Sequence, residues 1–114
     1  MHELGYISRI IPLAIEAAGE NRITNVREVS IAVGEMTGAM PELLEKAYRE
    51  STPGTLLENS DLVVTMVPVT AVCDECENNY HPSKENDYCC PSCGSKKSRI
   101  ISGREVTLVS IKEM

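Results

Sequence analysis

Two Cys-x-x-Cys pairs constrain the fold of this chain more than any other feature of its sequence. The first pair is Cys73 and Cys76, thirteen residues follow it, and the second pair is Cys90 and Cys93. Four thiolates with this spacing can surround one Zn²⁺ tetrahedrally, as they do in zinc ribbons. The sequence therefore predicts a closed zinc site made of these four side chains.

The same stretch holds a fifth cysteine, Cys89, and one histidine, His81. Cys90 has the two-residue spacing to Cys93 and Cys89 does not, so we expect Cys89 to be a spare thiol. His81 could in principle replace one sulfur, but four correctly spaced cysteines already fill a closed site, which favours a solvent-facing loop position. A thioredoxin-like dithiol would need a pair at a helix N-terminus, and neither pair has that setting.

The segment around the cysteines differs in composition from the rest of the chain, which is 114 residues long. Residues 71–99 hold all five cysteines and show no apolar periodicity. A segment of this size needs a metal or cross-links to hold a shape. We therefore predict an α+β domain made of residues 1–70 and 101–114, with a zinc-binding domain, residues 71–100, inserted into it.

Two amphipathic helices are expected before this insert. In residues 4–18 the apolar side chains recur three and four positions apart, and Gly19 ends the pattern. Pro12 lies inside this helix, and we expect a kink there rather than a break because the apolar stripe continues in phase. A second helix begins at Pro41, which suits a first turn, and stops at residues 52–54, Thr-Pro-Gly.

Three strands complete the expected fold. In the first strand, residues 28–33, apolar residues alternate with other residues. The second and third strands, residues 62–69 and 105–111, are rich in β-branched side chains. The predicted fold class is α+β, with two helices packed on a small three-stranded sheet and an inserted zinc-ribbon-like module that has four cysteine ligands. The alternating apolar residues of the first strand are Val29, Ile31 and Val33.

Charge and composition argue against several classes of function. The formal net charge is −6 and the chain has no Trp or Phe, whereas nucleic-acid surfaces need clustered Lys, Arg and aromatic residues. The start has no basic region, and no stretch approaches the roughly 20 apolar residues of a membrane span. No nucleophile–base pair, phosphate loop or paired carboxylates are visible. We expect a cytoplasmic protein that is not an enzyme and binds neither nucleic acid nor membranes.

The first three residues, Met1-His2-Glu3, offer a second metal site. The α-amine, the His2 backbone nitrogen and the His2 imidazole can close fused chelate rings around one ion. Nitrogen-rich tetragonal sites of this kind favour Ni²⁺ or Cu²⁺ over Zn²⁺. Viewed alone the signal is weak, because a histidine at position 2 usually belongs to a frayed terminus.

Together these features make the chain resemble the HypA family of hydrogenase nickel-incorporation proteins. The resemblance covers the whole chain and rests on "MHE", "VSIAVGEMTG" between the helices, and "CDEC" with "CPSCG" before the last strand. It implies that Ni²⁺ binds through His2 with Met1 and Glu3 beside it. It also implies structural Zn²⁺ bound by Cys73, Cys76, Cys90 and Cys93.

The resemblance further implies a function and partners. We expect a nickel metallochaperone that works with a nickel-handling GTPase and delivers the ion to the large-subunit precursor of [NiFe] hydrogenase, in some organisms also to urease. The alternative is a zinc-ribbon adaptor that binds protein or RNA partners without carrying nickel. The sequence leaves the oligomeric state open, and a homodimer is one of the states considered.

Overall fold

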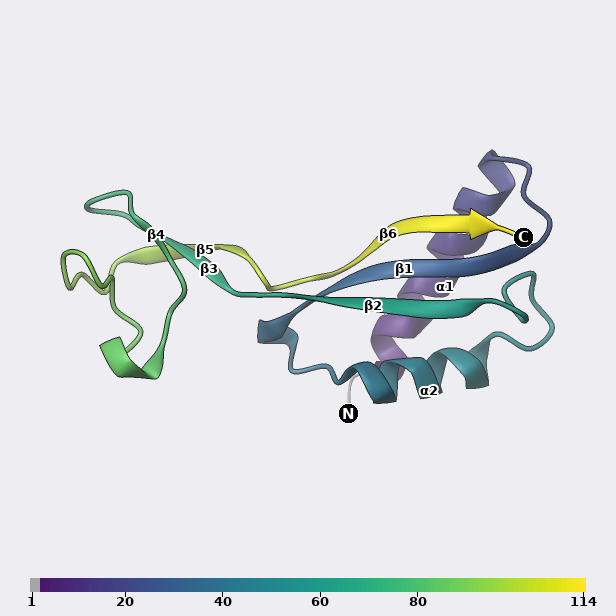
Figure 1. Ribbon diagram of the computed structural model, residues 1–114, viewed down its shortest axis with the longest axis horizontal. Coiled ribbons are helices and arrows are strands. Elements are labelled where there is room, and N and C mark those ends of the chain that lie inside the picture. The colour runs from purple at the N-terminus through teal and green to yellow at the C-terminus, as the bar shows by residue number, and fades with distance from the viewer. Residues whose placement is uncertain (1–2) are drawn as a thin grey trace.

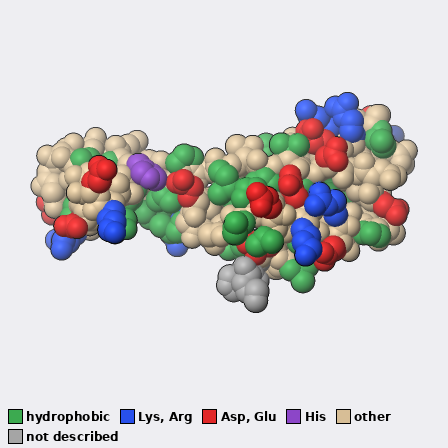
Figure 2. Space-filling view, turned by 60° about the horizontal axis from the view of Figure 1, so that its bottom comes forward, with side chains coloured by type: hydrophobic (Ala, Val, Ile, Leu, Met, Phe, Trp, Pro, Cys, Tyr) green, Lys and Arg blue, Asp and Glu red, His purple; other side chains and the backbone are tan. Residues whose placement is uncertain are grey.

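The protein is elongated and has two lobes (Figure 1). The computed structural model describes residues 3–114, which extend 53 × 28 × 17 Å along the principal axes. One lobe contains both α-helices and a three-stranded sheet, and the other contains a smaller sheet. The space-filling view shows the same two lobes joined by a narrower waist (Figure 2). No helix in residues 3–114 has the length and apolarity that a bilayer-crossing segment requires.

The larger lobe is built on a sheet with the strand order β2–β1–β6. The central strand β1 (Val26–Gly34) pairs in parallel with β2 (Asp61–Val67) and antiparallel with β6 (Val106–Glu113). The predicted three-stranded sheet is thus confirmed. The apolar residues predicted to alternate in its central strand are fully buried: Val29, Ile31 and Val33.

Two helices, α1 (Glu3–Glu20) and α2 (Pro41–Ser51), pack their apolar faces on one side of this sheet (Figure 1). The α1 helix continues through Pro12, as the in-phase apolar stripe predicted. The predicted start and end of the second helix also agree with the structure. The predicted fold class, two helices on a small sheet, is confirmed. The helical contribution to the core includes Ile7, Ile10, Ala14, Leu44 and Tyr48.

The smaller lobe contains a sheet that the sequence did not predict. The central strand β3 (Thr70–Cys73) pairs antiparallel with β4 (Asn79–Tyr80) and β5 (Ser98–Ser102). These strands are two to five residues long, which is too short for an apolar alternation to stand out. The buried cluster beside them contains two cysteines among four residues: Ala71, Cys73, Tyr80 and Cys90.

The two lobes are joined where three backbone segments approach one another closely. Gly103 has a φ of +89°, and a Cβ atom on it would lie 2.7 Å from the Cα atom of Val69. A Cβ atom on Gly34 would overlap the carbonyl group of Gly103. Only glycine permits both the positive φ and this close approach of one backbone to another. The junction therefore depends on two glycines that are far apart in the sequence.

Replacement of Gly103 tests this junction. Gly103→Ala should lower the free energy of unfolding by roughly 2 kcal/mol or more, because the added methyl group meets backbone atoms at a positive φ. Gly19→Ala in α1 is the matched control, since no atom lies within 4 Å of the position its Cβ would take. The control should be stabilised by up to about 1 kcal/mol. Urea unfolding of the zinc-loaded proteins measures both, and equal stability of the two variants would contradict the close approach.

Candidate metal centre

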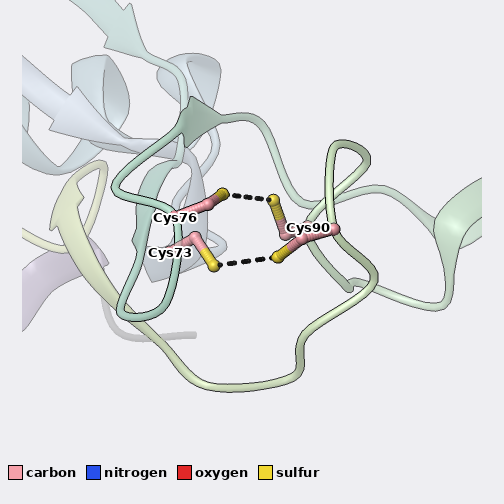
Figure 3. Close-up of side chains that lie close together, drawn as sticks. Cys73, Cys76 and Cys90 are labelled. Carbon is pink, nitrogen blue, oxygen red and sulfur yellow. Dashed lines mark hydrogen bonds between the residues drawn. The ribbon is translucent and has the colours of Figure 1, made fainter.

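Four cysteine side chains meet at one end of the smaller lobe. Their Sγ atoms all lie within 4.8 Å of one another, and they come from Cys73, Cys76, Cys90 and Cys93. The Sγ atoms of Cys73 and Cys93 are 3.5 Å apart, and those of Cys76 and Cys90 are 3.6 Å apart (Figure 3). A tetrahedral Zn²⁺ with Zn–S bonds of about 2.3 Å would separate its sulfurs by about 3.8 Å. The cluster therefore has the size of a four-thiolate zinc site.

Both cysteine pairs are presented by the same kind of turn. In the first turn the Glu77 N–H donates to the carbonyl oxygen of Cys73 at 2.9 Å, and Glu77 has a φ of +60°. In the second turn the Gly94 N–H donates to the carbonyl oxygen of Cys90 at 2.8 Å, and Gly94 has a φ of +76°. The positive φ expected at Gly94 is confirmed. Because the two turns match, each pair can offer its two sulfurs to one ion.

The electrostatic environment differs between the sulfurs. Backbone N–H groups of the first turn hydrogen-bond to the Cys73 thiol and lower its pKa. Burial raises the pKa of Cys90, but hydrogen bonds from backbone N–H groups and neighbouring thiols outweigh burial and hold the pKa at about 6. The Ser95 N–H lowers the pKa of Cys93, but the nearby thiols and burial together raise it to about 12. Four thiolates this close repel one another, so their joint ionisation needs a cation between them.

The ion pair beside the sulfur cluster is weak. Asp74 and Arg99 form an ion pair of 2.7 Å between the first turn and β5, and both side chains are largely exposed. An exposed pair of this kind contributes about 0–1 kcal/mol to stability. A metal ion bonded to all four sulfurs would therefore link the two turns more strongly than this ion pair does.

Cys89 and His81 lie outside the sulfur cluster. The half-buried Cys89 thiol donates to the carbonyl oxygen of Asp87 at 3.5 Å. The His81 side chain is exposed, and its Nδ1 lies 2.7 Å from the carbonyl oxygen of Val69 at the junction between the lobes. On the other side of the same residue, the Val69 N–H donates to Oε1 of Glu35 at 3.0 Å. The sequence did not predict this bridge between the lobes, because it joins residues far apart in the chain.

Of the three residues of the second predicted metal site, only Glu3 belongs to the described part of the chain. Met1 and His2 lie outside the described residues, and Glu3 begins α1. Glu3 is only 7% exposed, and its Oε2 accepts a hydrogen bond of 3.1 Å from the Met40 N–H at the N-terminus of α2. Sequence reasoning treated Glu3 as a neighbour of the metal and missed this contact. The available signal was that Met40, the N-cap of α2, has no polar side chain for capping.

A four-cysteine centre on a small lobe, joined through a glycine junction to an α+β lobe, defines a two-lobed metal-binding protein. A sequence model of the family described as "Hydrogenase/urease nickel incorporation, metallochaperone, hypA" matches residues 1–113. The chain therefore belongs to the HypA family, as the sequence features predicted. Membership makes it a nickel metallochaperone of hydrogenase maturation. It does not favour the alternative of a zinc-ribbon adaptor that carries no nickel.

Individual relatives and solved structures agree with this assignment. The chain is 33% identical over 112 residues to a hydrogenase maturation factor HypA of Picosynechococcus sp., covering 98% of each chain. It is 34% identical over 112 residues to that of Streptomyces avermitilis, covering 97% of this chain and 86% of the relative. It resembles the solution structure of the Ni metallochaperone HypA from Helicobacter pylori with a TM-score of 0.76 and 25% identity, covering 100% of this chain and 98% of the other.

Serine variants of the two adjacent cysteines test the sulfur cluster. Cys90→Ser should lose zinc and unfold the smaller lobe, because metal binding supplies folding free energy on the order of 10 kcal/mol in small zinc modules. Cys89→Ser is the matched control, and it should keep one zinc per chain and a folded lobe. Metal analysis after dialysis and amide hydrogen exchange of residues 70–102 measure both effects. Equal loss of zinc from the two variants would contradict the cluster.

Proposed function

We propose that this chain carries Ni²⁺ at its N-terminus, through His2 with Met1 and Glu3 beside it, and holds Zn²⁺ permanently in the sulfur cluster. The observation that carries the proposal is the closed cluster of four sulfurs within 4.8 Å. A tetrahedral site filled by four thiolates has no open position for an exchangeable ion. A cargo ion therefore needs a different site. The zinc ligands in this proposal are Cys73, Cys76, Cys90 and Cys93.

The chemistry of the N-terminus suits an exchangeable nickel ion. Its amine, backbone nitrogen and imidazole form the nitrogen-rich ligand set that Ni²⁺ prefers, while zinc prefers the thiolates of the other lobe. The buried carboxylate of Glu3 lies in the first turn of α1 and accepts a hydrogen bond at the N-terminus of α2. Helix N-termini carry partial positive charge, which disfavours a cation, and this carboxylate offsets it.

Nickel transfer follows from this separation of the two sites. Ni²⁺ is captured at the N-terminus, held by deprotonated nitrogen ligands, and released when docking to a partner offers a better ligand set. The partners in this proposal are a nickel-handling GTPase and the large-subunit precursor of [NiFe] hydrogenase, with urease as a further recipient. The family description, which names hydrogenase, urease and nickel incorporation, supports these recipients. The protein catalyses no reaction of its own in this scheme, and it acts in the cytoplasm, where thiols stay reduced.

Two changes at the N-terminus test the nickel site. His2→Ala should abolish nickel binding, and a Gly-Ser extension ahead of Met1 should weaken it sharply because the amine becomes an amide. Both proteins should keep zinc and an unchanged circular dichroism spectrum, since the sulfur cluster lies in the other lobe. Nickel binding of the unmodified protein should weaken below neutral pH, because an α-amine with a pKa of about 7.7 to 8 and an imidazole with a pKa of about 6.5 must lose protons. Calorimetric titration with Ni²⁺ measures each case, and unchanged affinity in both variants would refute the site.

Two substitutions at Glu3 separate positioning from charge. Glu3→Gln keeps an oxygen that can accept the Met40 N–H, whereas Glu3→Ala leaves that N–H without this acceptor and should lower stability by about 1 kcal/mol. If Glu3 only positions the terminus, the Gln variant should bind nickel like the unmodified protein. If the carboxylate charge is needed at the site, both variants should weaken nickel binding. Nickel titration together with urea unfolding distinguishes the two roles.

A further inference from the structure

Asn78 follows the first cysteine turn and lies opposite Cys73 in the β3–β4 hairpin. The two strands pair antiparallel with Val72 opposite Asn79. The Cys73 N–H donates to the carbonyl oxygen of Asn78 at 3.0 Å, so the register continues by one more residue. Residues directly opposite in an antiparallel pair share one face of the sheet. The Asn78 side chain therefore lies on the same face as Cys73, which carries one sulfur of the cluster.

Asn78 contacts three of the four cysteines of the cluster. Its carbonyl oxygen accepts the Cys73 N–H, as described above. Its own N–H hydrogen-bonds to the Cys76 thiol and lowers the pKa of that thiol, whereas burial and neighbouring thiols raise this pKa and outweigh the hydrogen bond. Its side-chain Nδ2 donates to Sγ of Cys90 at 3.9 Å. The first two contacts stay within one hairpin, and the third reaches the other cysteine pair.

The contact with Cys90 differs from the other hydrogen bonds to the same sulfur. The backbone N–H groups of Ser92 and Cys93 also hydrogen-bond to Cys90, and both belong to its own turn. Asn78 lies twelve positions before Cys90, in the hairpin of the first pair. Figure 3 shows that the sulfurs of Cys76 and Cys90 face each other across the gap between the two turns. The Asn78 amide therefore links the two turns without passing through a metal ion.

The sulfur that this amide contacts is the buried one of the second pair. Cys90 is only 2% exposed, whereas Cys93 is exposed to solvent. Tyr80 lies two residues after Asn78, on the same face of the hairpin, and packs in the same buried cluster as Cys90. Water is therefore largely kept from the Cys90 sulfur. A buried charge is costly unless hydrogen bonds or a counter-charge compensate it, so a donor is most effective at this sulfur.

An amide side chain suits this position because of the chemistry of a metal-bound thiolate. A thiolate accepts hydrogen bonds and cannot donate them, so it selects the NH₂ end of the Asn78 amide. Hydrogen bonds to charged groups are roughly twice as strong as those between neutral groups, so ionisation of Cys90 strengthens the contact. Groups that hydrogen-bond to metal ligands orient these ligands and affect how tightly the metal is held.

We propose that Asn78 is a positioning residue of the sulfur cluster, whose side-chain amide donates to the Cys90 thiolate, joins the two cysteine turns and slows release of the bound metal. This inference rests on the zinc occupancy proposed above. When one bond between a sulfur and the metal opens, the amide keeps Cys90 beside the first pair, so the ion is rebound before it leaves. The same hydrogen bond stabilises the negative charge that the thiolates bring to the site.

Two substitutions of Asn78 test this role in the full, zinc-loaded chain. Asn78→Ala removes the donor and keeps both backbone contacts, and it should speed the transfer of zinc to excess EDTA about tenfold. Asn78→Asp keeps the size of the side chain but places a second acceptor with negative charge beside the thiolate, so it should speed the transfer at least as much. Asn79→Asp is the matched control, because Asn79 is exposed and faces the other side of the hairpin. Its rate should stay within about twofold of the unmodified protein.

A spectroscopic measurement on the unmodified protein tests the hydrogen bond itself. In protein loaded with a spin-active cadmium isotope, the side-chain amide protons of Asn78 should show scalar coupling to the metal through the Cys90 sulfur. A side chain that only fills space would show no such coupling. Because this measurement needs no substitution, it decides the proposal even if a variant of Asn78 fails to fold.

The zinc content of the unmodified protein separates this inference from the proposed function. A chain that retains no zinc after dialysis refutes the proposed zinc site, and the inference falls with it. A chain that retains one zinc, but loses it at the same rate from the two Asn78 variants as from Asn79→Asp, overturns the inference alone. The absence of coupling between the Asn78 amide and cadmium also overturns it and leaves the proposed function standing.

Discussion

The smaller lobe depends on one constraint, which is that four thiol groups lie within 4.8 Å of one another. Once ionised, four thiolates this close would repel one another. This lobe has four buried residues around its sheet, and two of them, Cys73 and Cys90, belong to the cluster itself. So little apolar surface cannot offset the conformational entropy of ordering about thirty residues. A cation bound between the thiolates would supply the missing free energy. Metal binding at the sulfur cluster would therefore be part of the folding of this lobe.

The two lobes differ in what holds each of them folded, because only the smaller lobe contains the sulfur cluster. The larger lobe has an apolar core drawn from two helices and a sheet, so it does not need a metal to fold. In the function that we propose, the exchangeable ion binds at the N-terminal end of this lobe. The lobes are held together by Gly34 and Gly103, and by Val69, whose backbone bonds Glu35 on one side and His81 on the other. The junction between the lobes is therefore short and made largely of backbone atoms.

Sequence patterns predicted the features that depend on neighbouring residues. The alternation in β1 and the stripe in α1 were long enough to identify because buried faces repeat at the period of each element. The small sheet was not predicted because its strand β4 has only two residues, which is too few to show an alternating pattern. This strand is held by its pairing with β3. The hydrogen bond from the Met40 N–H to the Glu3 carboxylate joins residues 37 positions apart, so no local pattern could predict it. The sequence of α2 shows only that its N-cap residue has no polar side chain.

The sequence by itself determined which four cysteines cluster, the two helices and the three strands of the larger sheet. It could do so because Cys-x-x-Cys spacing and apolar periodicity are local properties, set by the geometry of one turn or one element. Tertiary structure alone decided that β1 is central, that β2 is its parallel neighbour, and that the pairing of β6 with β1 contains a bulge. Strand order, register and close approach at Gly103 depend on which distant segments meet, and that depends on burying one shared core rather than on any local pattern.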